Sequence, residues 1–383
     1  MMMRMTTLSC ILAGLIVSTP VWAQSKEFKI GFVMSLTGPG APYGTLATKG
    51  MQAAVAAVNQ SGGIGDMPAR LVICDSQTVE QQAVLCVRKL LVNDQVNVLI
   101  GTGFSAQNLA VLPIVDQVGA PFFTIGASPL AFRPLKKWAF KSTTLPEDEY
   151  PSMLAYLKSK GHNSIGLIIP SGAFGDSAAK FIEDTAPKVG LSLVAKEMYA
   201  LSDTDMTAQI SRIRSANPDV VLNLPATTAA GAAITKKMDQ LGMKQTIVVG
   251  INMQTPEFLS LVGPLAEQLL YVGIKSQLGE FGSEALAPFY RTMEAELKKI
   301  DPNAMLVSPN LQTADSVLLT REAAKNLGEK ALDRETLLKS IESLNSAPGL
   351  LGRWTFSNQS HETNLSGGVT LLRYKDGKWV AAQ

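Results

Sequence analysis

Short apolar segments alternate with helical segments along the first third of the chain, and this order is the feature that most restricts its fold. Four segments have the short apolar character of buried strands: 28–35, 69–74, 96–100 and 121–125. Helical spacing of apolar residues marks the segments between them, at 45–59, at 79–92 and after Ser105. Strands that alternate with helices in this way predict an α/β fold with a parallel, doubly wound sheet.

A second alternating series follows and predicts a second sheet of the same kind. Its strands are expected at 164–169, 191–198, 219–223, 246–250 and 269–275. Three helices then come without strands between them, at 283–299, 311–327 and 334–344, and we expect them to pack on the first sheet. Strands in the tail, at 352–356 and 368–374, would return the chain to the second lobe. Three crossings between two lobes make a hinge, and ligands favour the cleft between two domains.

The N-terminal residues have the features of an export signal. Arg4 precedes an apolar stretch at 8–17, which is too short to span a bilayer, and Ala23 is a small residue suited to cleavage. We expect residues 1–23 to be removed and the rest to be exported, since no later apolar run is long enough for stable membrane insertion. The formal net charge of +2 gives no basic excess that would indicate nucleic acid as a partner.

Residue types that carry catalysis or bind metals are scarce in this chain. The two histidines, His162 and His361, lie in polar turns and are expected at the surface. No nucleophile elbow, phosphate-binding loop or zinc-ligand spacing occurs in the sequence. We therefore expect a binding protein rather than an enzyme, with no cofactor and no metal. Cys74 and Cys86 form an even pair in an exported chain, which favours a disulfide, with two buried thiols as the alternative.

The ends of two neighbouring predicted strands carry small and hydroxyl residues. The strand at 96–100 runs into residues 101–105, and a helix follows Ser105, which is a preferred N-cap residue. The next strand runs into residues 126–128, a Gly-Ala-Ser sequence. Ligands in open α/β sheets bind outside the carboxyl ends of strands, and free N–H groups at a helix start suit an anion such as a carboxylate.

Several segments together resemble a known family. They are IGFVMSLTGPGAPYG (30–44), VNVLIGTGFSAQNLAVLPIVDQVGAPFFTIGAS (96–128), AFGDSAAKFI (173–182) and GRWTFSNQS (352–360). These segments, in this order, resemble the substrate-binding proteins of branched-chain amino-acid type ABC importers, the Leu/Ile/Val-binding protein family. The resemblance extends over nearly the whole chain after residue 23.

The resemblance implies a type I periplasmic binding protein fold, with two Rossmann-like lobes joined by a three-stranded hinge. We expect lobe 1 to comprise 24–142 and 276–352, and lobe 2 to comprise 143–275 and 353–383. Crossings are then expected near 142–144, 273–275 and 352–354. A periplasmic location, a small-molecule ligand that closes the lobes, and permease and ATPase subunits as partners follow from the same resemblance.

The resemblance also implies two groups of ligand-binding residues. The ligand carboxylate would be held by hydroxyl and backbone groups of Ser105, Gly126, Ala127 and Ser128. Tyr43, in the first Gly/Pro loop, would touch the rest of the ligand, and Phe174 stands where the family has a tyrosine in the wall of lobe 2.

Two positions depart from the amino-acid-binding members of the family. Asn252 stands where those members have an acidic residue that pairs with the ligand ammonium, and Ala226 stands at an aromatic wall position. Burial of an ammonium group without a carboxylate partner is costly. We therefore predict a ligand with a carboxylate and no α-ammonium group, and the room beside Ala226, Phe174 and Phe104 suits an aromatic or branched acid.

A ligand-binding domain of a sensor or chemoreceptor remains an alternative to a transport component, and two alternatives for the ligand also remain open at this point. A shift in the alignment would make Glu257, or a carboxylate from 147–149, the ammonium partner, and the protein would then be a receptor for branched-chain or other amino acids. A neutral group bound near Ser105 would instead indicate a receptor for amides or urea.

Overall fold

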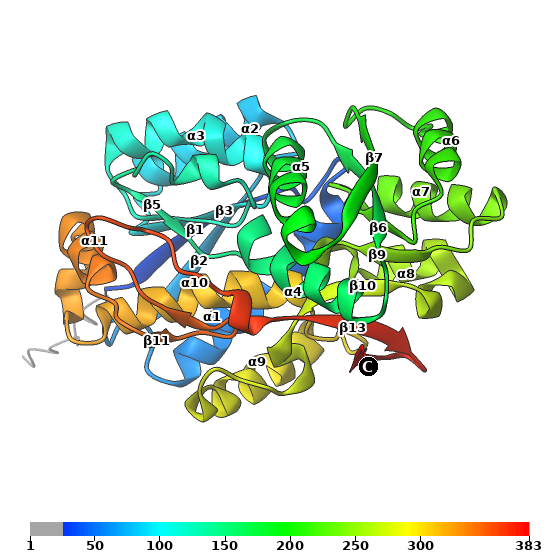
Figure 1. The fold of residues 1–383 in the computed structure, drawn as a ribbon. Helices are drawn as coiled ribbons and strands as arrows, with labels where there is room; N and C mark the ends of the chain where they lie inside the picture. Colours follow the sequence, from blue (N-terminus) through cyan, green and yellow to red (C-terminus); the bar gives the residue numbers. More distant parts are fainter. Residues whose placement is uncertain (1–25, 383) are drawn as a thin grey trace, which may run out of the picture.

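The computed structural model describes residues 26–382, so the predicted signal peptide, residues 1–23, lies outside the described residues. Two β-sheets form the centres of two lobes that lie side by side (Figure 1). Both sheets alternate strands and helices along the chain, as the apolar pattern predicts. In the described residues no helix combines the length and the apolar character that a membrane crossing requires.

The sheet of lobe 1 consists of parallel strands in the order β2-β1-β3-β4-β5. Their bounds are Phe28–Met34 (β1), Ala69–Asp75 (β2), Val98–Thr102 (β3), Phe122–Thr124 (β4) and Ala139–Lys141 (β5). Every residue of β3, the central strand, is buried, because helices cover both faces of the sheet. This explains why these strands are continuous apolar runs rather than alternating ones.

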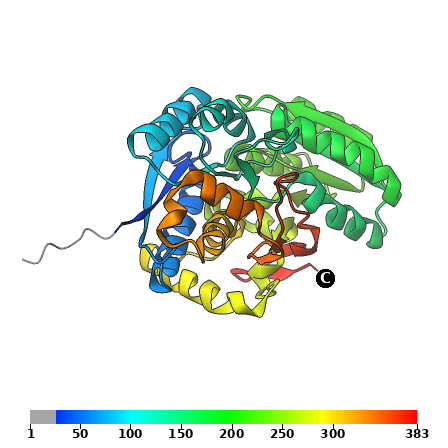
Figure 2. The same ribbon diagram turned by 90° about the vertical axis from the view of Figure 1, so that its left-hand side faces the viewer.

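Helices from both ends of the sequence cover this sheet. They are α1 (Ala41–Gln60), α2 (Glu80–Arg88), α3 (Ser105–Val118), α9 (Ala287–Ile300), α10 (Ser308–Ala324) and α11 (Arg334–Glu342). Helix α1 packs against α9 and α10, which Figure 2 shows in yellow and orange beside the blue N-terminal elements. The prediction that the late helices pack on lobe 1 is therefore confirmed.

The sheet of lobe 2 has the order β14-β13-β10-β9-β8-β6-β7. Its strands are β6 (Ser164–Pro170), β7 (Ser192–Tyr199), β8 (Val220–Asn223), β9 (Thr246–Val249), β10 (Leu270–Ile274), β13 (Val369–Lys375) and β14 (Lys378–Ala381). Strands β13 and β14 are antiparallel additions, since the tail returns from lobe 1 and ends in a hairpin. The helices of this lobe are α4 (Pro146–Ser159), α5 (Ala173–Thr185), α6 (Thr207–Ala216), α7 (Thr228–Gln240) and α8 (Pro256–Val262).

Two of the three crossings lie where the sequence predicts them. The first follows β5 and leads through Ser142–Thr144 into α4, and the second follows the end of β10 at Ile274. The third lies later than predicted. Strand β12 (Arg353–Trp354) pairs with β11 (Ala347–Pro348) and not with the sheet of lobe 2.

The segment after β12 also stays with lobe 1. The backbone N–H of Lys141, at the end of β5, donates to the carbonyl of His361 over 3.0 Å. The chain first contacts lobe 2 at Leu365, whose backbone N–H donates to Asp148 of α4, and it joins the sheet of lobe 2 when β13 begins at Val369. The predicted boundary at residue 353 is therefore wrong, because a strand-like segment in the sequence does not reveal which partner it pairs with.

His361 was expected at the surface and is instead buried, with 1% of its area exposed. Its ring stacks on Phe140 at a centroid distance of 3.9 Å, and Nδ1 lies 3.0 Å from the carbonyl of Ala139. The polar turn that contains His361 folds back onto the edge strand β5, which explains the burial.

Cys74 and Cys86 are joined in a disulfide, with their Cα atoms 5.6 Å apart. The bond links the end of β2 to helix α2, as predicted.

Candidate functional site

A cavity lies between the two lobes and beside the hinge. Its volume is about 90 Å³, several times what one water molecule needs, so it suits a small molecule. Its lining residues come from strand ends, helix starts and the first crossing: Tyr43, Gly103, Phe104, Ser105, Ile125, Ala127, Thr143, Glu149, Tyr150, Phe174, Leu224, Ala226, Gly250, Ile251, Asn252 and Gln312. The carboxyl ends of β3, β4, β8 and β9 all open into it, as expected for parallel sheets.

Six of the eight predicted ligand-binding residues line this cavity: Tyr43, Ser105, Ala127, Phe174, Ala226 and Asn252. The other two, Gly126 and Ser128, do not belong to its described lining. A Cβ atom at Gly126 would lie 2.7 Å from the backbone nitrogen of Ser105, so a glycine allows the end of β4 to approach the start of α3. Ser128 is buried, and its hydroxyl accepts from the backbone N–H of Leu130 over 3.4 Å. Ligand contact at these two positions stays a prediction.

Ser105 is the first residue of helix α3 and faces the cavity. The N-cap position expected for Ser105 belongs to Phe104, which has extended backbone angles. The hydroxyl of Ser105 is thus not used as the helix cap. Hydroxyl and first-turn N–H groups at the positive end of a helix can together donate hydrogen bonds to a carboxylate.

Tyr43 lies in the first turn of α1 rather than in the preceding loop, because Pro42 fits the first turn of a helix without loss of a hydrogen bond. The hydroxyl of Tyr43 donates to Oε1 of Gln312 over 2.8 Å. Burial raises the pKa of Tyr43 well above its ordinary value, so the phenol is a neutral group. Gln312, from the buried helix α10, is a lining residue that sequence reasoning missed.

On the lobe 2 side, Phe174 lies in the first turn of α5 and Ala226 follows strand β8. Asn252 lies in the short helical turn after β9, and its amide nitrogen donates to the carbonyl of Pro225 over 2.8 Å. The side chain therefore holds two strand ends together while it lines the cavity. With Leu224 and Ile251, these residues give lobe 2 a mainly apolar wall.

Glu149 carries the one carboxyl group among the described lining residues. It comes from the first turn of α4, 5% of its area is exposed, and the hydroxyl of Thr144 donates to Oε1 over 2.5 Å. Burial raises the pKa of this carboxyl group to about 7; Asp148 also raises it, whereas the Thr144 hydrogen bond and Lys141 lower it. Sequence reasoning named Glu149 only as an alternative.

In residues 26–382 no three His, Cys, Asp or Glu side chains are grouped so that they could hold a metal ion. The cavity offers hydroxyl, amide and aromatic groups and one carboxyl group. These groups can bind and orient a small molecule.

A family model described as "Periplasmic binding protein" matches residues 27–378. The chain belongs to the periplasmic binding protein family. A Leu/Ile/Val-binding protein, BraC3 of Rhizobium johnstonii, is 24% identical to it over the full length of both chains. An extracellular ligand-binding receptor of Rhodopseudomonas palustris is 25% identical, covers 94% of this chain and 100% of its own, and superposes with a TM-score of 0.82.

A solute-binding protein of an ABC transporter from R. palustris, solved in complex with 4-hydroxybenzoate, has the same fold. Its TM-score is 0.78 at 19% identity, over 94% of this chain and 96% of its own. The periplasmic binding protein family consists of solute-binding components of ABC importers. The chain is accordingly a ligand-binding receptor of this type and not an enzyme, and its partners include a small-molecule ligand and the permease and ATPase subunits of an importer.

Proposed function

We propose that the protein binds a small carboxylic acid with an aromatic or branched body in the cleft between its lobes. The observation that carries this proposal is the position of Ser105, which lines the cavity at the start of α3 and whose hydroxyl does not cap that helix. Phe104, Phe174 and Leu224 supply apolar surface for the body of the acid. The fold accommodates such a molecule, since the R. palustris structure with 4-hydroxybenzoate shares it.

A second candidate is an amino-acid receptor, and the position of Glu149 favours it. The carboxyl group of Glu149 lines the same cavity as Ser105, so an ammonium group could pair with it. The curated relative from Rhizobium johnstonii carries the name of a Leu/Ile/Val-binding protein. The two candidates differ only in whether the ligand carries an ammonium group in addition to its carboxylate.

The test is a thermal-shift screen of refolded, ligand-free protein against two panels, followed by calorimetric titration of the compounds that bind. One panel contains aromatic and branched carboxylic acids, and the other contains L-amino acids, amides and urea. A ligand at about one hundred times its Kd stabilises the native state by about 2.7 kcal/mol, which raises the melting temperature visibly. Stabilisation by acids alone supports the proposal, and stabilisation by amino acids alone contradicts it and favours the second candidate.

The variant Ser105→Ala tests the carboxylate anchor. We expect it to weaken binding by about ten- to one-hundred-fold, because a hydrogen bond to a charged group is lost. Ser215→Ala, an exposed serine near the end of α6, is the matched control and should bind as the wild type does. Equal affinity of the Ser105→Ala variant and the wild type would exclude this serine as the anchor.

A further inference from the structure

We propose that Glu149 determines the specificity of the cleft by contacting the ligand as a neutral carboxylic acid, so that a carboxylate ligand is bound together with one proton. The inference rests on the proposed function, since it concerns a ligand that carries a carboxylate. The inference assigns a role to Glu149, which lies in the first turn of α4, directly after the first crossing.

The geometry leaves one oxygen of Glu149 available to a ligand. Oε1 accepts from the hydroxyl of Thr144 over 2.5 Å, and Thr144 itself is buried. In the described part of the chain this is the one side-chain hydrogen bond of the carboxyl group. Oε2 is therefore the atom that can carry a proton and donate it in a hydrogen bond into the cavity.

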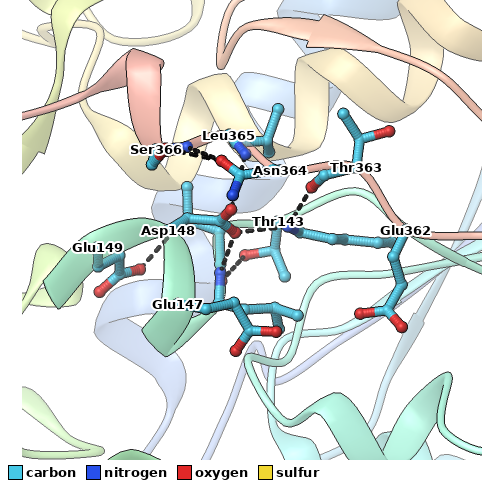
Figure 3. Close-up of polar contacts among 12 residues, drawn as sticks. Thr143, Glu147, Asp148, Glu149, Glu362, Thr363, Asn364, Leu365 and Ser366 are labelled. Carbon is cyan, nitrogen blue, oxygen red and sulfur yellow. Dashed lines mark hydrogen bonds and ion pairs between the residues drawn. The ribbon is translucent and has the colours of Figure 1, made fainter. Parts of the chain in front are cut away.

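No positive charge is free to pair with Glu149 within the described residues. Lys141 is near enough to lower the pKa of Glu149, but its Nζ donates to Oδ2 of Asp148 over 2.5 Å and to the carbonyl of Thr363 over 2.6 Å. Figure 3 shows Asp148 within this network, with Glu149 pointing away from it. The charge of Lys141 is thus already paired with Asp148 at the hinge.

The other groups that face Glu149 do not favour its charge either. Asp148, on the same turn of α4, raises the pKa of Glu149. Tyr43 from α1 and Tyr150 from α4 are buried phenols whose own pKa values are raised by burial and by Glu149. Burial raises the pKa of Glu149 to about 7, so the group gains its proton close to neutral pH.

A ligand carboxylate in the same cavity favours the protonated form of Glu149 further. Two carboxylates in a small site of low polarity cannot both be ionised without a large repulsion, so they share one proton. When an ionised acid binds to the form in which Glu149 is ionised, a proton from the solvent joins Oε2 of Glu149, and no other bond forms or breaks. The resulting O–H group donates to an oxygen of the ligand.

For a ligand that carries an ammonium group, we expect proton exchange in the opposite direction. Its charge favours the ionised form of Glu149, so that binding releases a proton and affinity rises with pH. The direction of proton exchange therefore decides which kind of ligand Glu149 selects.

The experiment is calorimetric titration with benzoate, 3-methylbutanoate and L-leucine as probes, between about pH 6 and pH 9, in buffers of different ionisation enthalpy. We expect proton uptake with either acid that rises from near zero at about pH 6 toward one proton at about pH 9, and affinity that falls up to about tenfold per pH unit above neutral pH. In Glu149→Gln the pH dependence should disappear while the affinity at acidic pH is kept, because the amide donates as the neutral acid does. Glu147→Gln, a neighbouring carboxylate outside the cavity lining, is the matched control and should keep the pH dependence.

Each of the other outcomes contradicts either the inference alone or the inference together with the proposed function. Acids that bind with no proton uptake and with pH-independent affinity overturn the inference and leave the proposed function standing. Release of a proton on binding of L-leucine, with loss of that binding in Glu149→Gln, overturns both in favour of an amino-acid receptor. If none of the three probes binds, the proposed function is wrong and the inference is wrong with it. A melting curve of each variant establishes that it is folded.

Discussion

Three consecutive acidic residues at the start of α4 have three different environments. Glu147 forms an ion pair with Arg133, Asp148 accepts from Lys141, and Glu149 faces the cavity. Each step along an α-helix turns the side chain by about 100°, so neighbouring residues point in different directions (Figure 3). The role of each carboxylate is therefore set by the orientation of the helix.

The buried carboxyl group of Glu149 should make the stability of the ligand-free protein depend on pH. Its pKa is about 7 in the folded protein against an ordinary value of 4.5, so the native state holds a proton that the unfolded state releases. The associated stability is complete below pH 4.5 and is lost as pH rises through 7, by about 3 kcal/mol at most. We expect the free energy of unfolding to fall over this range in the wild type and much less in Glu149→Gln, as measured by urea denaturation. Parallel curves for the two proteins would contradict this.

At the scale of elements, helix α10 is fixed to the β11–β12 hairpin by one buried carboxylate. Asp315 accepts from the backbone N–H groups of Leu350 and Leu351 over 2.5 and 3.0 Å, and from Nε1 of Trp354 over 2.9 Å. Asp315→Ala leaves three buried donors without a partner, and we expect it to lower the free energy of unfolding by roughly 3–5 kcal/mol. Urea denaturation measures this, with Glu294→Ala on the exposed face of α9 as a control expected to change stability by less than about 1 kcal/mol.

The first and third crossings are tied together by a buried ion pair. Asp148 accepts from Lys141, and its Oδ1 accepts from the backbone N–H of Leu365 over 2.7 Å. Asp148→Ala leaves the charge of Lys141 buried and unpaired, so we expect a loss of about 3–5 kcal/mol. The double variant Lys141→Met with Asp148→Ala should lose less than Asp148→Ala alone. Additive losses in a double-mutant cycle of unfolding free energies would show that the two side chains are not coupled.

The disulfide connects the edge strand β2 to the helix that follows it. Cys74 and Cys86 are separated by 12 residues, and closure of this loop restricts the unfolded chain. We expect the variant with both cysteines replaced by serine to be less stable by about 2–3 kcal/mol. A melting curve of the wild type under reducing conditions should reproduce that of the variant, and unchanged melting would contradict the prediction.

At the scale of the whole molecule, two lobes share one cavity and three crossings join them. The lining residues come from both lobes, so a bound ligand stabilises the arrangement in which the lobes face each other closely. We expect small-angle X-ray scattering to show a smaller radius of gyration at saturating ligand than in the free protein. An unchanged radius would mean that the lobes keep their closed arrangement without a ligand.

The sequence by itself determined the features that depend on local pattern. Apolar strands and helical spacing predict both sheets, and short segments around Tyr43, Ser105 and Ala127 predict part of the cavity lining, because parallel strands bring their carboxyl ends to one edge. The tertiary structure alone decided which distant segments meet. Gln312 reaches the cavity from a late helix, His361 is buried against β5, and the third crossing leads through Leu365 to β13, which begins at Val369. Glu149 enters the cavity rather than its two acidic neighbours because the packing of α4 on lobe 2 sets the direction of each side chain, and chain order does not record that packing.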